Sequence, residues 1–221
     1  MPDFDAQNLA LGLTNYIVLL FSLSFHESAH AWMAFRLGDD TAASLGRITL
    51  NPIAHIDLFG TVVMPLLQIF GGLPVIGWAK PTPYDPGRFR RGVSLRRGHI
   101  SVAFVGPLSN LFLAFIFAVV FAVILRVDVP PDMKNGLYSL MSIGIAMNIA
   151  LAVFNMLPVP PLDGSHVLSW SLPRALGEKF DHLARNYGTM ILWILFLSGA
   201  LGYIIGPVQR VATLFIFQLI R

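Results

Sequence analysis

The sequence predicts an all-α fold, a polytopic membrane helix bundle of about four to six membrane segments with a small membrane-embedded β-like or re-entrant element. Two observations carry this prediction. Charged residues make up only 12% of the 221 residues, whereas soluble domains carry about 25%. Hydrophobic residues make up 55%, the mean hydropathy is +0.68, and the apolar residues lie in several long runs. We therefore expect a single transmembrane domain over residues 1–221.

The first predicted helix spans residues 8–37 and is apolar over most of its length. Gly38 follows it and suits the end of a helix, because glycine tolerates the left-handed backbone that is common there. The residues before this helix lack a basic stretch, so we expect a retained span rather than a cleaved signal peptide.

The next apolar segment, 58–79, is interrupted by Pro65, Gly71, Gly72 and Pro74. It is too short for two full spans, since each needs about 20 residues. It can be one span, or a re-entrant segment that packs against protein or water. If it is re-entrant, most lysines and arginines fall on one side of the membrane. That bias favours re-entry and makes this side cytoplasmic.

Three further apolar runs predict spans, at residues 100–125, 136–157 and 187–205. A proline-rich loop, 158–168, follows the second of these spans and contains Asp163. Gly206 and Pro207 are expected to end the third span. Residues 208–220 form a last apolar segment, either spanning or interfacial. Asn110 and Asn148 lie inside predicted spans and are interpreted as amides that pack between helices.

The motif HESAH, residues 26–30, lies at the end of the apolar run of the first helix. His26 and His30 are four residues apart, which places both imidazoles on one helix face about 5–6 Å apart, where they can hold one metal ion. Glu27 lies about 100° around the helix and can still reach a water on that metal as general base. The alternative is a structural pair of core histidines. It is disfavoured because burying two imidazoles and a carboxylate without a partner is costly.

A catalytic zinc site usually has three protein ligands and one open position. The chain has no cysteine, so the third ligand must be a histidine or a carboxylate. Asp163 is the strongest candidate, because it follows a span at a place where prolines break the helix, and metal binding is a reason to keep a carboxylate there. Two alternatives stay open: Asp163 could cap a helix, or His166 could be the ligand. Asp57 is more simply a turn or cap residue.

Three separated motifs resemble those of the site-two protease family, whose signatures read HExxH and NxxPxPxxDG. They are HESAH at 26–30, GPLSN at 106–110 and NMLPVPPLDG at 155–164. Between them, GWAKPTP at 77–83 is similar to the short branch of the family that lacks PDZ and CBS domains. The resemblance covers most of the chain, and the motifs occur in the family's order.

This resemblance implies an intramembrane zinc metalloprotease in which His26, His30 and Asp163 bind Zn²⁺ and Glu27 is the catalytic base. It also implies that Asn155 lies near the substrate carbonyl. The segment 77–83 would form a membrane-embedded edge that contacts the substrate.

The predicted function is therefore hydrolysis of peptide bonds in transmembrane segments of membrane proteins, with a zinc-activated water and Glu27 as general base. The expected partners are a transmembrane-helix substrate and membrane lipid, and not nucleic acid. The expected location is the cell membrane, with the active site toward the cytoplasmic side. The alternative is a non-catalytic zinc-binding scaffold or a metal transporter. A transporter would need ionisable residues along several spans, and a scaffold would not need Glu27.

Overall fold

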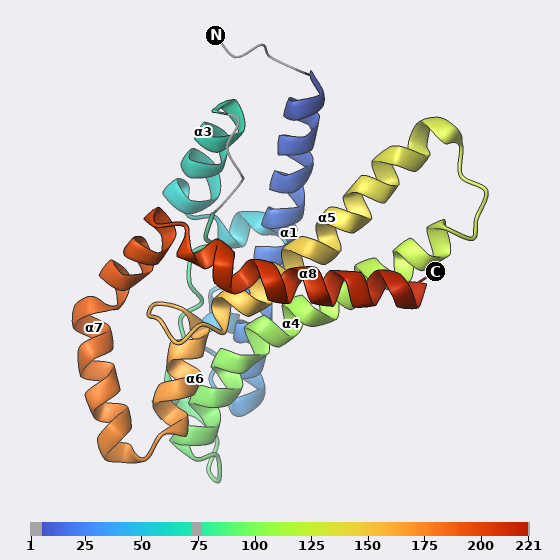
Figure 1. Cartoon of the computed structure of the whole chain (residues 1–221). Coiled ribbons are helices and arrows are strands. Elements are labelled where there is room, and N and C mark those ends of the chain that lie inside the picture. Colours follow the sequence, from blue (N-terminus) through green and yellow to red (C-terminus); the bar gives the residue numbers. More distant parts are fainter. Residues whose placement is uncertain (1–5, 72–76, 221) are drawn as a thin grey trace.

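The computed structural model describes residues 6–71 and 77–220, and over these residues the chain forms helices and loops but no strand (Figure 1). Among the described residues, four helices are apolar and long enough to cross a membrane: α1 (Ala6–Leu37), α4 (Leu95–Ile124), α5 (Pro131–Asn155) and α8 (Ala200–Ile220). The predicted all-α, multi-pass membrane architecture is confirmed. The shorter elements are α2 (Thr41–Ser44), η1 (Pro52–His55), η2 (Leu58–Val63), α3 (Met64–Phe70), η3 (Pro86–Arg88), α6 (Asp163–Ser171) and α7 (Arg174–Leu197).

Helix α1 begins two residues before the predicted range 8–37 and ends at the predicted residue, Leu37. Gly38 follows with a φ of +111°, in the left-handed region that favours glycine. Its amide donates to the carbonyl of Phe35 at 3.0 Å, which pairs one of the last helix carbonyls. The HESAH motif therefore lies about two turns before the C-terminal end of α1.

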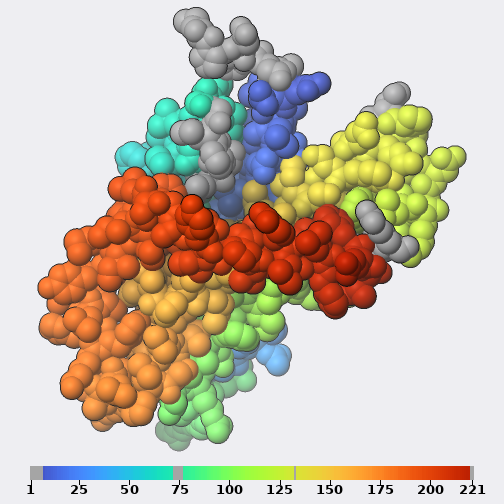
Figure 2. All heavy atoms as spheres, viewed as in Figure 1, coloured from blue at the N-terminus to red at the C-terminus, as the bar shows by residue number. Residues whose placement is uncertain are grey.

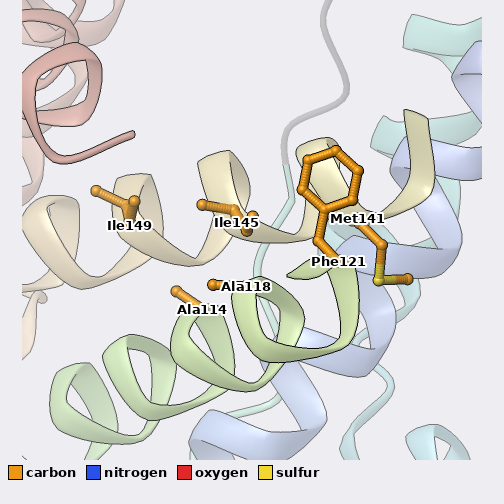
Figure 3. Packing of buried hydrophobic residues seen from close by; sticks show 6 residues of the cluster. All are labelled: Ala114, Ala118, Phe121, Met141, Ile145 and Ile149. Carbon is orange, nitrogen blue, oxygen red and sulfur yellow. The ribbon is translucent and has the colours of Figure 1, made fainter. Parts of the chain in front are cut away.

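Helices α4 and α5 form an antiparallel pair, and α1 packs against both (Figure 1). The core of this pair consists of Ala114, Ala118 and Phe121 from α4 and Met141, Ile145 and Ile149 from α5 (Figure 3). Ala114 and Ala118 are small and let the two backbones approach closely, which favours helix association in lipid. Pro131 begins α5, a position where its missing N–H removes no helix hydrogen bond.

The predicted span 187–205 is wrong, because the structure divides these residues between two helices. Helix α7 ends at Leu197, and Gly199 adopts a left-handed φ of +74°. Helix α8 then continues through Pro207 instead of ending there, so it also contains the predicted segment 208–220. The turn at Gly199 was missed because hydropathy does not detect a turn at a single glycine. Helix α8 can continue through Pro207 because a proline inside a membrane helix removes only one backbone hydrogen bond.

Helix α8 lies across α4 and α5 on the face shown in Figure 2. The side chain of Gln209 donates to the backbone carbonyl of Ala146 on α5 at 2.9 Å. This polar contact gives α8 a fixed position on the pair, because an amide that faces apolar helices needs a hydrogen-bond partner.

Elements η2 and α3 occupy the first part of the predicted segment 58–79 and have six and seven residues. Together they are shorter than the about 20 residues that a span needs. The predicted segment also includes residues 72–76, which lie outside the described residues. From Trp78 onward the chain is extended: the amide of Trp78 donates to Gly60 at 3.2 Å and that of Lys80 to His55 at 2.9 Å.

This extended segment makes no β-ladder, because Pro81 and Pro83 have no N–H to donate. It is held instead by two buried charged side chains. The guanidinium of Arg47 donates to the carbonyl of Pro81 at 3.0 Å, and the carboxylate of Asp39 accepts from the amide of Asp85 at 2.7 Å. These contacts fix residues 78–85 beside the C-terminal half of α1.

Candidate metal centre

Three potential metal ligands gather on α1: His26, Glu27 and His30 each offer one atom, and these atoms lie within 4.8 Å of one another. The two Nε2 atoms of the imidazoles are 3.0 Å apart. Both imidazoles are buried, with exposures of 4% for His26 and 7% for His30. The helical spacing of the motif thus places the two imidazoles on one face, as the sequence predicted.

Asp163 reaches the same point from α6. Its Oδ2 atom lies 3.1 Å from Nε2 of His26, and its Oδ1 atom lies 3.4 Å from Nε2 of His30. Asp163 is the first residue of α6, where the positive end of the helix dipole favours a carboxylate. The structure therefore brings together positions 26, 30 and 163, which are far apart in the sequence.

The alternatives to Asp163 receive no support from the structure. The capping position of α6 is Leu162, so Asp163 is not the cap. His166 is exposed, and in the described part of the chain no hydrogen bond or ion pair joins it to His26 or His30. Asp57 is a cap, as predicted, because its carboxylate accepts the first amides of η2.

The other ring nitrogen of each histidine faces an atom that can only accept a hydrogen bond. Nδ1 of His26 lies 2.7 Å from the amide oxygen of Asn110, and Nδ1 of His30 lies 2.6 Å from the carbonyl of Val102. Both Nδ1 atoms must therefore carry the proton. In a neutral imidazole the remaining nitrogen has a lone pair, so both Nε2 atoms present lone pairs to each other and to Asp163.

This arrangement fits a metal cation. Oδ2 of Asp163 is buried and has no hydrogen-bond partner, although Nε2 of His26 lies 3.1 Å away. A proton shared between the two imidazoles would pair only their two Nε2 atoms. A divalent cation would instead bind both Nε2 atoms and the carboxylate of Asp163. Two imidazole nitrogens and a carboxylate oxygen are a donor set suited to zinc.

Glu27 is half-buried and is held by the extended segment. Its Oε2 atom accepts a hydrogen bond from the backbone amide of Thr82 at 2.8 Å, and the Thr82 hydroxyl donates to the backbone carbonyl of Glu27 at 3.0 Å. The two residues are 55 positions apart, and no sequence pattern indicates their contact. The carboxylate of Glu27 is therefore oriented by a segment outside α1.

The profile of "Peptidase family M50" matches residues 124–198, which include Asp163. "Putative zinc metalloprotease YwhC" of Bacillus subtilis is 37% identical to this chain over 201 residues, which are 89% of this chain and 87% of that protein. "Putative zinc metalloprotease MJ0611" of Methanocaldococcus jannaschii is 40% identical over 170 residues, 71% of this chain and 74% of that protein. No solved structure is significantly similar to the chain.

The chain belongs to peptidase family M50. A further relative, "Putative zinc metalloprotease Rip2" of Mycolicibacterium smegmatis, is 30% identical over 193 residues, which are 82% of this chain and 66% of that protein. Membership in family M50 confirms the resemblance to the site-two proteases that the three motifs indicated. It also confirms Zn²⁺ as the predicted cofactor, in agreement with the histidine and carboxylate cluster on α1.

Asn155, the remaining predicted site residue of this family M50 chain, is the last residue of α5. Its side-chain amide donates to the carbonyl of Leu151, one turn earlier in the same helix, at 3.0 Å. In the described part of the chain, no hydrogen bond joins it to His26, His30 or Asp163. Its role toward substrate therefore stays a prediction.

Tyr84 lies on the extended segment, near the metal centre, and was not predicted from the sequence. Its hydroxyl lies 2.8 Å from Nδ1 of His99. Burial, and then the negative charge of Asp163, raises the pKa of Tyr84 to about 12. The phenol is therefore protonated at neutral pH and donates this hydrogen bond. Since the ring of His99 also stacks on Trp170, the contact ties the extended segment to α4 and α6.

Proposed function

We propose that this chain is an intramembrane zinc metalloprotease that hydrolyses peptide bonds in transmembrane segments of other membrane proteins. The observation that carries the proposal is the convergence of His26, His30 and Asp163 at one point, with Glu27 beside them. The helix that carries the motif is itself long and apolar enough to cross a membrane, so the reaction would take place at membrane depth.

His26, His30 and Asp163 are proposed to hold the zinc ion. When bound, zinc supplies a Lewis acid that activates water and polarises the substrate carbonyl. Glu27 takes the proton from the attacking water and gives it to the leaving amine. The hydrogen bond from the Thr82 amide holds the Glu27 carboxylate in one orientation while it does so.

Asn155 is proposed to stabilise the negative charge that develops on the substrate oxygen. Its side-chain nitrogen has two N–H donors, and while one is bonded to the carbonyl of Leu151 the other would donate to that oxygen. Residues 156–162 follow as turns and bends between α5 and α6.

The substrate would be a transmembrane helix that unwinds locally, because the peptide bonds of an intact helix are already hydrogen-bonded and shielded. The extended segment 77–83 is proposed as the edge that holds the unwound chain. We propose that 58–79 is re-entrant and that the active site faces the cytoplasm. Arg36 and Arg47, near the end of α1, and most of the other cations would then lie on that side.

The proposal is tested with purified protein and a model transmembrane substrate in detergent. Glu27→Gln is expected to keep bound zinc and to lose cleavage by about 10²-fold or more, because the general base is removed. Glu178→Gln is the matched control, since Glu178 is the only other glutamate and lies exposed in an ion pair with Arg174. Wild-type cleavage should stop when a chelator removes zinc.

Two results would contradict the proposal. Cleavage by Glu27→Gln at the wild-type rate would remove Glu27 from the mechanism. Wild-type protein that binds zinc but cleaves no transmembrane substrate would instead support a zinc-binding scaffold or a transporter.

A further inference from the structure

A chain of side-chain hydrogen bonds joins α1, α4 and α5 beside His26. It contains Ser22, Asn110 and Asn148, all of which are fully buried at 0% exposure. They lie between three helices that are apolar enough to span a membrane. A buried amide is costly unless its donors and acceptors are paired. The hydrogen-bond partners of Asn110 and Asn148 therefore indicate the role of each side chain.

The hydrogen-bond partners determine the orientation of both amides. The nitrogen of the Asn148 side chain donates to the carbonyl of Gly144 and to the hydroxyl of Ser22, each at 2.9 Å. Its oxygen is left to accept from the side-chain nitrogen of Asn110 at 3.0 Å. The Asn110 nitrogen also points toward the carbonyl of Ser22, at 3.4 Å. The oxygen of Asn110 therefore faces His26.

This orientation determines the tautomer of His26. The Asn110 oxygen has no proton, so Nδ1 of His26 must donate across the 2.7 Å contact. Nε2 of His26 then keeps its lone pair on the side of His30 and Asp163. His30 is oriented by the backbone carbonyl of Val102, which no side-chain substitution removes. Of the two imidazoles, only that of His26 depends on a side chain of α4.

We propose that Asn110, held in place by Asn148 and Ser22, is a positioning residue that fixes the tautomer and ring orientation of His26 for metal binding. The inference rests on the proposed role of His26 as a zinc ligand. It differs from the interpretation of Asn110 as a packing amide: a packing amide contributes to stability, whereas a positioning residue also changes zinc affinity. Partners of this kind typically change metal affinity by about 10–100-fold.

The test measures the affinity of the purified full-length protein for Zn²⁺ alone, by competition with a chromophoric chelator. Asn110→Leu removes the acceptor and is expected to weaken zinc binding by about 10–100-fold. Asn110→Asp keeps an acceptor for Nδ1 and is expected to bind zinc at least as tightly as wild type. Ser109→Ala is the matched control, because Ser109 is also buried on α4 but donates only to Gly106 of its own helix.

A twofold or smaller effect of Asn110→Leu would overturn the proposal, as would equal weakening in Asn110→Leu and Asn110→Asp. Asn148→Leu leaves the contact with His26 but removes the support of Asn110, so a smaller loss of zinc affinity is expected. A loss of thermal stability in these variants without a loss of zinc affinity would show a packing role only.

A measurement on the wild type makes the test independent of variant folding. The ¹⁵N spectrum of His26 in the zinc-free protein should show a proton on Nδ1, and an Nδ1 without a proton would overturn the proposal. None of these readouts requires cleavage. If the wild type binds zinc but cleaves nothing, the proposed function is wrong. The proposed role of Asn110 is still tested in that case, because the zinc affinities of the Asn110 variants decide it.

Discussion

Gly106 of α4 lies against the imidazole of His30: a Cβ atom added to Gly106 would be 2.5 Å from Cε1 of His30 and 2.6 Å from Cε1 of His26. Non-bonded carbon atoms do not approach so closely, so both imidazoles fit beside α4 only because residue 106 has no side chain. Gly106, the glycine of the GPLSN motif, therefore leaves space for both imidazoles of the metal centre, and Asn110, four residues later, contacts His26.

Gly106→Ala is expected to displace both imidazoles and to weaken zinc binding by about 10-fold or more, as changes beside metal ligands commonly do. The competition assay with the chelator measures this effect. Gly136→Ala on α5 is the control, because no described atom lies within 4 Å of a Cβ at that position. Unchanged zinc affinity in Gly106→Ala would mean that the helices move apart at no cost.

Asp163→Ala should lower the zinc content of the purified protein, since it removes the only carboxylate within 3.4 Å of both imidazoles among the described residues. Metal analysis after dialysis measures the content. His166→Ala, three residues later on the same helix, should keep the wild-type content, because the His166 side chain is exposed. Full zinc content in Asp163→Ala would exclude Asp163 as a ligand.

Thr82→Pro should lower kcat by about 10-fold and leave zinc content unchanged, because proline cannot donate the backbone hydrogen bond that orients the Glu27 carboxylate. Thr82→Val removes the hydroxyl but keeps the amide, so its effect should be smaller. Cleavage of the model substrate measures both variants. Equal losses of activity would assign the effect to the hydroxyl or to the packing of the segment.

The proposed orientation predicts which loops face the cytoplasm. The natural chain has no cysteine, so single cysteines can be labelled without a background. In intact cells a membrane-impermeant maleimide should label Asp128→Cys, in the loop between α4 and α5, but not Arg91→Cys, before α4. Both positions are exposed, and both should react after lysis. The opposite labelling pattern would place the active site toward the outside.

Local patterns in the sequence are sufficient to predict part of the metal centre. The spacing of His26 and His30 predicts a shared helix face, because the geometry of one turn depends on the backbone alone. Asp57 was predicted as a turn or cap residue for a similar reason, and the structure shows the cap. In contrast, the span 187–205 was placed by hydropathy, which does not register the left-handed turn at Gly199.

The sequence by itself determined the class of the protein, an apolar helical membrane chain, and the pair of histidines on α1. Both follow from composition and from periodicity along one helix. The sequence also named Asp163 as the strongest third ligand, but only the tertiary structure showed that its carboxylate meets those histidines, that Thr82 holds Glu27, and that Asn110 faces His26. These contacts join segments far apart in the chain. Their geometry depends on how α1, α4 and α6 pack, and no local spacing encodes that packing.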